Sequence, residues 1–220
     1  IDIRRALPTK LMQDQAIKML ISNISCADEV WTVSEGARQN LIDLGYEENE
    51  HHRIRIMENG VDFPRGRADP EDAAELRAEL GVEGHGPVFI FVGRLLWYKG
   101  IRHILDSLKI LDEKNIDFRM MFVGDGADRA EIETYVDELK LREKVIYYMD
   151  TKDIRGFIRS FELRSINKAA GDLFIFPSLY DTNGIVVREA AACGVASVMI
   201  KGSCAAEGIT HMHTGILTED

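Results

Sequence analysis

The sequence has few of the features that mark secreted, membrane-spanning or metal-binding proteins. Its three cysteines, Cys26, Cys193 and Cys204, are an odd number without C-x-x-C spacing, which argues against a disulfide framework and against a cysteine zinc site. We expect reduced thiols that act as packing residues in a cytoplasmic protein. No apolar run approaches the roughly 18–20 residues of a membrane span, and the amino terminus lacks the apolar stretch of a signal peptide.

The sequence also has fewer basic than acidic residues. The 220 residues include 27 lysines and arginines against 37 aspartates and glutamates, which gives a net charge of −10. Nucleic acids normally bind a basic face, so we expect no nucleic-acid partner. With 45% apolar and 29% charged residues, the chain is typical of a globular protein that buries a core.

Both ends of the chain have the character of cut ends. It begins Ile1-Asp2 without a methionine and stops at Asp220, straight after a hydrophobic segment. We therefore expect a piece of a longer protein, and any peripheral contact with a membrane would come through the missing half.

Strand and helix patterns alternate along the sequence. Strands are expected at 29–33, 54–57, 88–92, 118–123, 145–148, 173–176 and 196–200. Helices are expected at 12–24, from a Ser34 cap to Gly45, at about 69–80, at 101–111, at 132–139, within 150–171 and from Ile185. Apolar strands separated by helices predict a parallel sheet covered on both faces, which is a doubly wound, Rossmann-like α/β fold.

The expected elements divide the chain into three parts. Residues 1–62 contain strand–helix–strand material that would end one Rossmann-like domain, and 63–86 form a linker with a helix. Residues 87–220 would form a second Rossmann-like domain, truncated at its carboxyl end. Ligands of such sheets bind outside the carboxyl ends of the strands, so we looked for chemistry just after each strand.

The loop after the expected strand 88–92 carries two cations. In Gly93-Arg94-Leu95-Leu96-Trp97-Tyr98-Lys99-Gly100, Arg94 and Lys99 lie five residues apart, just before a helix. Two cations, free backbone amides and a helix dipole are suited to a diphosphate. We therefore predict that Gly93, Arg94 and Lys99 bind one. The alternative is that Arg94 and Lys99 are solvated loop charges.

Two common nucleotide motifs are absent or incomplete. The P-loop pattern G-x-x-x-x-G-K-[ST] is missing. Gly124-Asp125-Gly126 begins a dinucleotide fingerprint, but Arg129 stands where the third glycine belongs. We predict that these glycines form a tight strand-to-helix turn rather than a dehydrogenase site.

The stretch after the expected strand 173–176 is the most informative. Asp181 and Glu189 lie eight residues apart, around a small polar turn that leads into a helix. Such a turn presents the backbone amides of Asn183, Gly184, Ile185 and Val186 at a helix N-terminus, which favours an anion. Glu189 would lie about one turn into the helix, where its carboxylate can accept hydrogen bonds from a ribose diol. The alternative is an ordinary helix cap with a surface glutamate.

Together these motifs resemble the retaining glycosyltransferases of family four. The resemblance runs in order and spacing through 92–100, 122–126 and 176–194, and it extends back through 27–34 and 59–62. It implies the GT-B fold, in which two Rossmann-like domains face each other across a cleft. It also implies retaining transfer of a sugar from a nucleoside diphosphate donor to an acceptor hydroxyl of a saccharide, a lipid or a small molecule, without a metal or another cofactor.

The resemblance also implies roles for single residues. Arg94 and Lys99 would hold the donor diphosphate, and Glu189 would bind the ribose hydroxyls. Asp181 occupies the place of the first glutamate in the Glu-x7-Glu motif, which faces the donor sugar, but it is one methylene shorter. Asn183 replaces the usual aromatic residue before Gly184. Glu207, in the last cleft-facing stretch, would also meet the donor.

Two other functions stay open. One is a non-catalytic nucleotide-sugar-binding domain, for which Asp181 in place of glutamate is the best argument. The other is an epimerase or phosphorylase on the same plan, although no lysine context for pyridoxal phosphate is visible. We expect the chain alone to bind a nucleoside diphosphate without transferring sugar. His211 and His213 form an H-x-H without an evident third ligand, so no metal site is expected.

Overall fold

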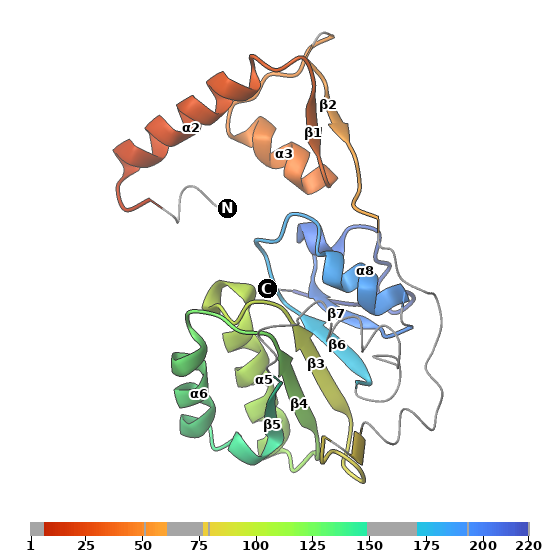
Figure 1. The fold of residues 1–220 in the computed structure, drawn as a ribbon. Coiled ribbons are helices and arrows are strands. Elements are labelled where there is room, and N and C mark those ends of the chain that lie inside the picture. The colour runs from red at the N-terminus through yellow and green to blue at the C-terminus, as the bar shows by residue number, and fades with distance from the viewer. Residues whose placement is uncertain are drawn as a thin grey trace.

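The computed structural model describes residues 7–50, 52–60, 77, 78, 80–148, 171–192 and 194–219. These residues form a small and a large parallel sheet with their helices (Figure 1). The strands are β1 (Val30–Thr32), β2 (Ile54–Ile56), β3 (Val88–Val92), β4 (Arg119–Val123), β5 (Val145–Tyr148), β6 (Leu173–Phe176), β7 (Ser197–Ile200) and β8 (Ile216–Thr218). The helices are α2 (Lys10–Ile24), α3 (Glu35–Asp43), α5 (Ile101–Glu113), α6 (Arg129–Glu138) and α8 (Ile185–Ala192), with short 3₁₀ helices η1 (Trp97–Lys99), η2 (Arg142–Lys144) and η4 (Cys204–Ala206).

The amino-terminal unit, residues 7–60, has the predicted strand–helix–strand order. β1 and β2 pair in parallel, with Val30 opposite Ile54. The Ser34 hydroxyl caps α3 by accepting a hydrogen bond from the Ala37 backbone N–H at 3.0 Å, as its position before the helix predicts. A small core of Val30, Tyr46 and Ile54 lies beneath.

The large sheet has the strand order β5-β4-β3-β6-β7-β8, and all of its pairings are parallel. The chain starts in the middle at β3, runs outward to β5, and then returns to β6 and runs outward in the other direction. Right-handed crossovers then place α5 and α6 on one face of the sheet and α8 on the other. Figure 1 shows α5 and α6 beside β3 and β4, and α8 beside β6 and β7. The predicted doubly wound α/β fold is confirmed.

The core of this sheet follows from the apolar spacing. α5 buries Ile101, Ile104, Leu105 and Leu108, whose intervals of three and four residues place them on one helix face. The continuous apolar run of β3 is buried because neighbouring strands and helices cover both of its sides. The sheet is thus a rigid base for the loops at its carboxyl end.

Some expectations differ from the structure or fall outside it. β8 was not predicted, because its three residues give too short a pattern. Cys26 is exposed, so the prediction that it packs internally is wrong, whereas Cys204 is half-buried. The linker 63–86 and the helix within 150–171 lie mostly outside the described residues, and the division at 62 and 86 stays a prediction.

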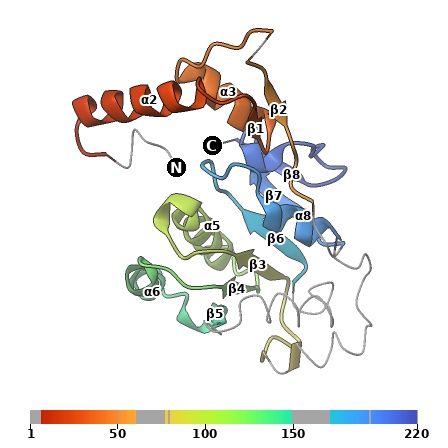
Figure 2. The ribbon, with the colours of Figure 1, turned by 45° about the horizontal axis from the view of Figure 1, so that its top comes forward.

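The amino-terminal unit lies on the side of α8 and of the turn that precedes it (Figure 2). The contact is direct, because the Arg188 guanidinium of α8 forms an ion pair of 2.8 Å with Glu58. In the described part of the chain, no helix is both long enough and apolar enough to cross a membrane.

Candidate functional site

The loop after β3 meets the loop after β6 where the strand order reverses. Gly100 has a φ of +79°, and a Cβ atom on it would lie 2.3 Å from the Pro177 carbonyl oxygen. Only glycine accommodates both this backbone conformation and this approach. The two predicted donor-binding segments are therefore in contact at the topological switch point of the sheet, where ligands of such folds bind.

The short helix η1 holds Lys99 in place. The Trp97 backbone N–H donates to Asp128 at 2.8 Å, and its indole N–H donates to Glu131 at 3.0 Å. The Arg102 guanidinium packs on the rings of Trp97 and Tyr135, 4.8 and 4.4 Å from their centroids. These contacts from α5 and α6 fix the backbone from which Lys99 projects.

Lys99 is a buried cation. Its residue is 8% exposed, and Nζ donates to Asp181 Oδ1 at 2.5 Å. The alternative of a solvated loop charge is therefore wrong for Lys99. The ion pair brings a predicted diphosphate-binding residue together with the predicted sugar-facing residue, although 82 positions separate them in the chain.

Arg94 has a different environment. It is exposed and donates to the Tyr98 hydroxyl at 2.9 Å. The structure places it in the same loop as Lys99, but the solvated-charge alternative stays open for it.

The turn from Pro177 to Gly184, called the β6–α8 turn below, ends at a glycine in the left-handed backbone region. Gly184 has a φ of +61°, and a Cβ atom on it would lie 2.6 Å from the Ala205 Cβ. α8 begins at Ile185, so the backbone from Asn183 to Val186 forms its N-terminus, as predicted. Which of these amides binds a ligand stays a prediction.

Several polar atoms of this turn lack partners within the described residues. They are Asp181 Oδ2, Ser178 Oγ and Asn183 Oδ1, and each of these atoms is shielded from solvent. Buried polar atoms are nearly always hydrogen-bonded, so orphaned ones need an explanation. Asp181 Oδ2 belongs to the carboxylate that binds Lys99, and an orphaned carboxylate oxygen beside a lysine is typical of a site that takes a polar ligand.

Glu189 lies in the second turn of α8, as predicted, and its residue is half-buried. The alternative of an ordinary helix cap with a surface glutamate stays open for it. Its assignment to a ribose stays a prediction.

Glu207 does not have the predicted environment. Its two carboxylate oxygens accept hydrogen bonds from the backbone N–H groups of Glu35 and Gly36, at 2.9 and 2.6 Å. It therefore stabilises the N-terminus of α3, and both of its oxygens are engaged there. Burial beside this carboxylate raises the pKa of the Cys204 thiol.

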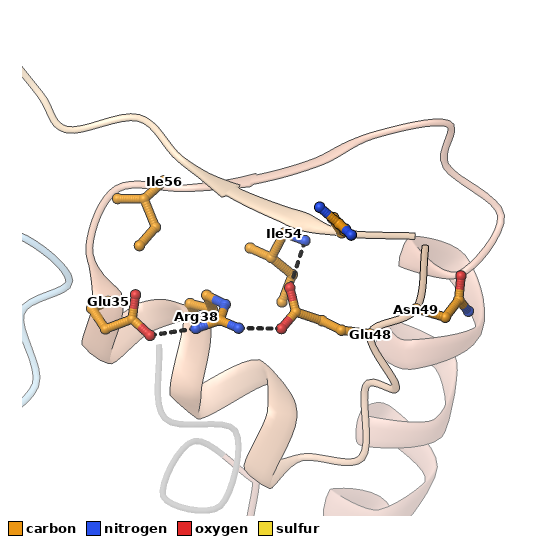
Figure 3. Close-up of a pocket in the computed structure, with 7 residues that line it drawn as sticks. Glu35, Arg38, Glu48, Asn49, Ile54 and Ile56 are labelled. Carbon is orange, nitrogen blue, oxygen red and sulfur yellow. Dashed lines mark hydrogen bonds and ion pairs between the residues drawn. The ribbon is translucent and has the colours of Figure 1, made fainter. Parts of the chain in front are cut away.

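The structure has a cavity between the two units and another on the amino-terminal unit. One, of about 710 Å³, is bordered by α3, α8 and the segment of Glu207. The other, of about 570 Å³, lies on the amino-terminal unit, where Arg38 donates to Glu35 at 2.5 Å and also to Glu48 (Figure 3). The Arg38 hydrogen bond, aided by the Ile54 N–H, holds the pKa of the Glu48 carboxyl below its usual range. Of the predicted donor-binding residues, Glu207 borders the larger cavity, whereas Arg94, Lys99, Asp181 and Glu189 line neither.

His211 and the glycine turn after β4 have structural roles in the protein. Among the described residues, no three histidine, cysteine or acidic side chains gather as a metal site would require. His211 Nδ1 accepts a hydrogen bond from the Leu217 backbone N–H at 3.0 Å, which is a structural use of this side chain. A Cβ atom on Gly126 would lie 2.2 Å from the Leu95 carbonyl oxygen, as expected of a tight turn after β4.

Sequence reasoning missed the contacts that cross from the amino-terminal unit to the β6–α8 turn. The Ser34 hydroxyl donates to the Thr182 carbonyl, and the Asn183 amide group donates to the Val33 carbonyl. The cap position of Ser34 was readable from the sequence. Its second partner, 148 residues away, was not.

Known proteins resemble this chain along most of its length. A glycosyltransferase of Methanocaldococcus jannaschii, MJ1607, is 28% identical over 205 residues, which are 91% of this chain and 49% of that protein. The 2-deoxystreptamine glucosyltransferase of Streptomyces kanamyceticus is 32% identical over 155 residues, 69% of this chain and 38% of that enzyme. The chain thus spans about half the length, or less, of the curated relatives it matches.

A solved structure with the same fold is that of Anabaena Alr3699/HepE in complex with UDP and glucose. It has a TM-score of 0.76 and 24% identity, and the match covers 94% of this chain and 53% of that one. The model of the family "Glycosyl transferases group 1" matches residues 72–220, which is more than half of the chain. This match covers β3 to β8 and both loops of the switch point, and the chain therefore belongs to the group 1 glycosyl transferases.

Proposed function

We propose that this protein transfers a sugar, with retention at the anomeric carbon, from a nucleoside diphosphate sugar to an acceptor hydroxyl. The observation that carries the proposal is the largely buried Lys99–Asp181 pair at the switch point, in which Asp181 Oδ2 has no partner among the described residues. The relatives support it, because one is named a glucosyltransferase and the HepE structure holds UDP and glucose. We place the reaction in the cytoplasm, in keeping with the unpaired thiols.

The chemistry asked of the protein is charge stabilisation. As the donor bond breaks, negative charge builds up on the departing diphosphate. Lys99, Arg94 and the amides at the N-terminus of α8 would neutralise it, and preorganised donors of this kind contribute strongly to catalysis. Glu189 would hold the ribose and Asp181 would face the sugar. We assign no general base and no metal.

In the structure, Lys99 already binds an anion, namely the Asp181 carboxylate. A donor diphosphate would compete with that carboxylate for Nζ. Once Lys99 releases Asp181, both carboxylate oxygens of Asp181 would be available to sugar hydroxyl groups. Binding of the diphosphate by Lys99 would thus be linked to binding of the sugar by Asp181.

The test is titration of the full-length protein with UDP-, GDP- and ADP-sugars, followed by transfer assays. We expect affinity for one base and a product that keeps the anomeric configuration of the donor, measured by NMR. Binding of a nucleotide sugar without turnover on any acceptor would favour the non-catalytic alternative. Inversion, or a rearranged sugar without an acceptor, would overturn the proposed reaction.

A further inference from the structure

The β6–α8 turn is bound by the amino-terminal unit. The Ser34 hydroxyl donates to the Thr182 carbonyl oxygen at 2.5 Å, and Asn183 Nδ2 donates to the Val33 carbonyl oxygen at 2.5 Å. Ser34 is 1% exposed and Asn183 is 5% exposed. Both hydrogen bonds are therefore partly shielded from water, and removing the acceptor partner of either buried side chain leaves that side chain unpaired.

Glu207 adds a third contact at the same place. Its carboxylate accepts the Glu35 and Gly36 backbone N–H groups, which belong to the first turn of the helix that Ser34 caps. The approach is close, because a Cβ atom on Gly36 would lie 2.5 Å from the Cys204 Sγ. Ser34, Asn183 and Glu207 thus join the start of α3 to the loops after β6 and β7. We call them the latch residues.

The latch is adjacent to the proposed donor site. Thr182 and Asn183 directly follow Asp181, whose carboxylate binds Lys99. A shift of the turn would move the Asp181 carboxylate relative to Lys99, because residues 181–183 share one short stretch of backbone. The geometry of the ion pair thus depends on contacts made by the other unit.

We propose that the latch residues are positioning residues, which set the Lys99–Asp181 pair in the geometry that receives the donor diphosphate and sugar. This inference rests on the proposed function. None of the three side chains has to touch the reacting atoms. Their effect passes through the backbone of the turn.

A contact that only joins the two units provides the matched control. The Arg188–Glu58 ion pair also crosses from one unit to the other, at 2.8 Å, but it is partly exposed and involves a side chain of α8 rather than a residue of the turn. Glu58→Gln weakens this ion pair between the units and changes no residue of the β6–α8 turn. Exposed pairs contribute little to stability, so the variant should fold normally.

The experiment compares variants of the full-length protein. Ser34→Ala removes the hydroxyl, and Asn183→Leu keeps the approximate size while removing the donor. Each should lower kcat/KM for the donor about two- to tenfold, the effect of one lost hydrogen bond. Each should also speed hydrogen exchange of the amides at 182–187. Ser34→Thr, which keeps the hydroxyl, should restore both quantities, and Glu58→Gln should change neither by as much as twofold.

Gly36→Ala separates the latch from the stability of α3. Alanine favours a helix more than glycine does, yet its Cβ would collide with Cys204 and displace the Glu207 carboxylate. We expect a lower kcat/KM in this variant too. Because α3 itself gains helix propensity, that loss would not come from a melted helix.

Two failures are distinguishable. A wild-type protein that neither binds a nucleoside diphosphate nor transfers sugar overturns the proposed function, and this inference with it. An active wild type overturns the inference alone if Ser34→Ala and Asn183→Leu affect kcat/KM no more than Glu58→Gln does, or if they lower only the melting temperature.

Discussion

Lys99 and Arg94 lie five residues apart in one loop, but their surroundings give them different roles in stability. Lys99→Met should leave the half-buried Asp181 carboxylate without its partner and cost about 1.5–3 kcal/mol of unfolding free energy. Arg94→Met, at an exposed position, should change it by no more than about 0.5 kcal/mol. Thermal or urea unfolding measures both, and equal losses would contradict the difference in burial.

Asp181 competes with the ligand that we propose for Lys99. Asp181→Asn removes a negative charge from beside the diphosphate and frees the lysine. We expect nucleoside diphosphate to bind about fivefold more tightly, which corresponds to about 1 kcal/mol of binding free energy. Turnover should fall, because the sugar loses its carboxylate. Calorimetry of the variant with UDP or GDP tests this, and weaker binding would contradict the competition.

At this scale the sequence predicted that Lys99 and Asp181 lie close together but not that they pair. Both follow strands whose carboxyl ends meet, so their proximity could be inferred, whereas the placing of Arg94 and Glu189 at the same site stays a prediction. The Lys99–Asp181 bond could not, because a pattern shows where each backbone goes and not which side chain a buried cation binds. Glu207 was misassigned for the same reason. Its partners are backbone amides of another helix, and such amides leave no mark on the sequence.

Among the elements, the start of α8 depends most on one residue. Gly184→Ala would place a Cβ atom in a left-handed backbone, 2.6 Å from Ala205 Cβ. We expect a loss of about 1–3 kcal/mol. Gly202→Ala is the matched control, because Gly202 also has a positive φ but nothing lies near the added atom. Denaturant unfolding should show the larger loss for position 184, and equal losses would argue against tight packing there.

Asp117, just before β4, binds the backbone just before β3 through its carboxylate, and the strength of this contact depends on pH. The Gly86 backbone N–H, then His85 and Arg119, lower the pKa of Asp117 to about 2. Since the folded pKa lies below the unfolded one, the ionised carboxylate stabilises the fold above about pH 4. That contribution is lost as the pH falls toward 2. Asp117→Asn should show a shallower loss of unfolding free energy over this range, and parallel curves for both proteins would refute the link.

Most helices and strands could be predicted from the sequence, for a physical reason. In α5 and in the central strands, burial follows the apolar spacing closely, because these segments are covered on the faces that the pattern marks. β8 and η1 were missed. Each is three residues long, and both are set by neighbours: β8 by pairing with β7, and η1 by its bonds to α6 and the preceding turn.

Over the molecule as a whole, the two units differ in how much core supports them. The amino-terminal unit has a two-stranded sheet over three buried apolar residues, whereas the large sheet has an extended core from β3 to η4. Amide hydrogens of β1 and β2 should therefore exchange faster than those of β3 and β4. Hydrogen exchange with mass spectrometry of the wild-type protein measures both. Equal protection would mean that the units open together.

The latch has a property that bears on recombination. In each of its four hydrogen bonds a side chain meets the backbone of the other unit: Ser34 and Asn183 donate to carbonyl oxygens, and Glu207 accepts from amides. Neither surface therefore has to recognise particular side chains opposite. A chimera that combines the amino-terminal half of one relative with the carboxyl-terminal half of another would keep these bonds wherever the backbone shape is shared, whereas the Arg188–Glu58 pair and the close approach of Gly36 to Cys204 would need matching by sequence.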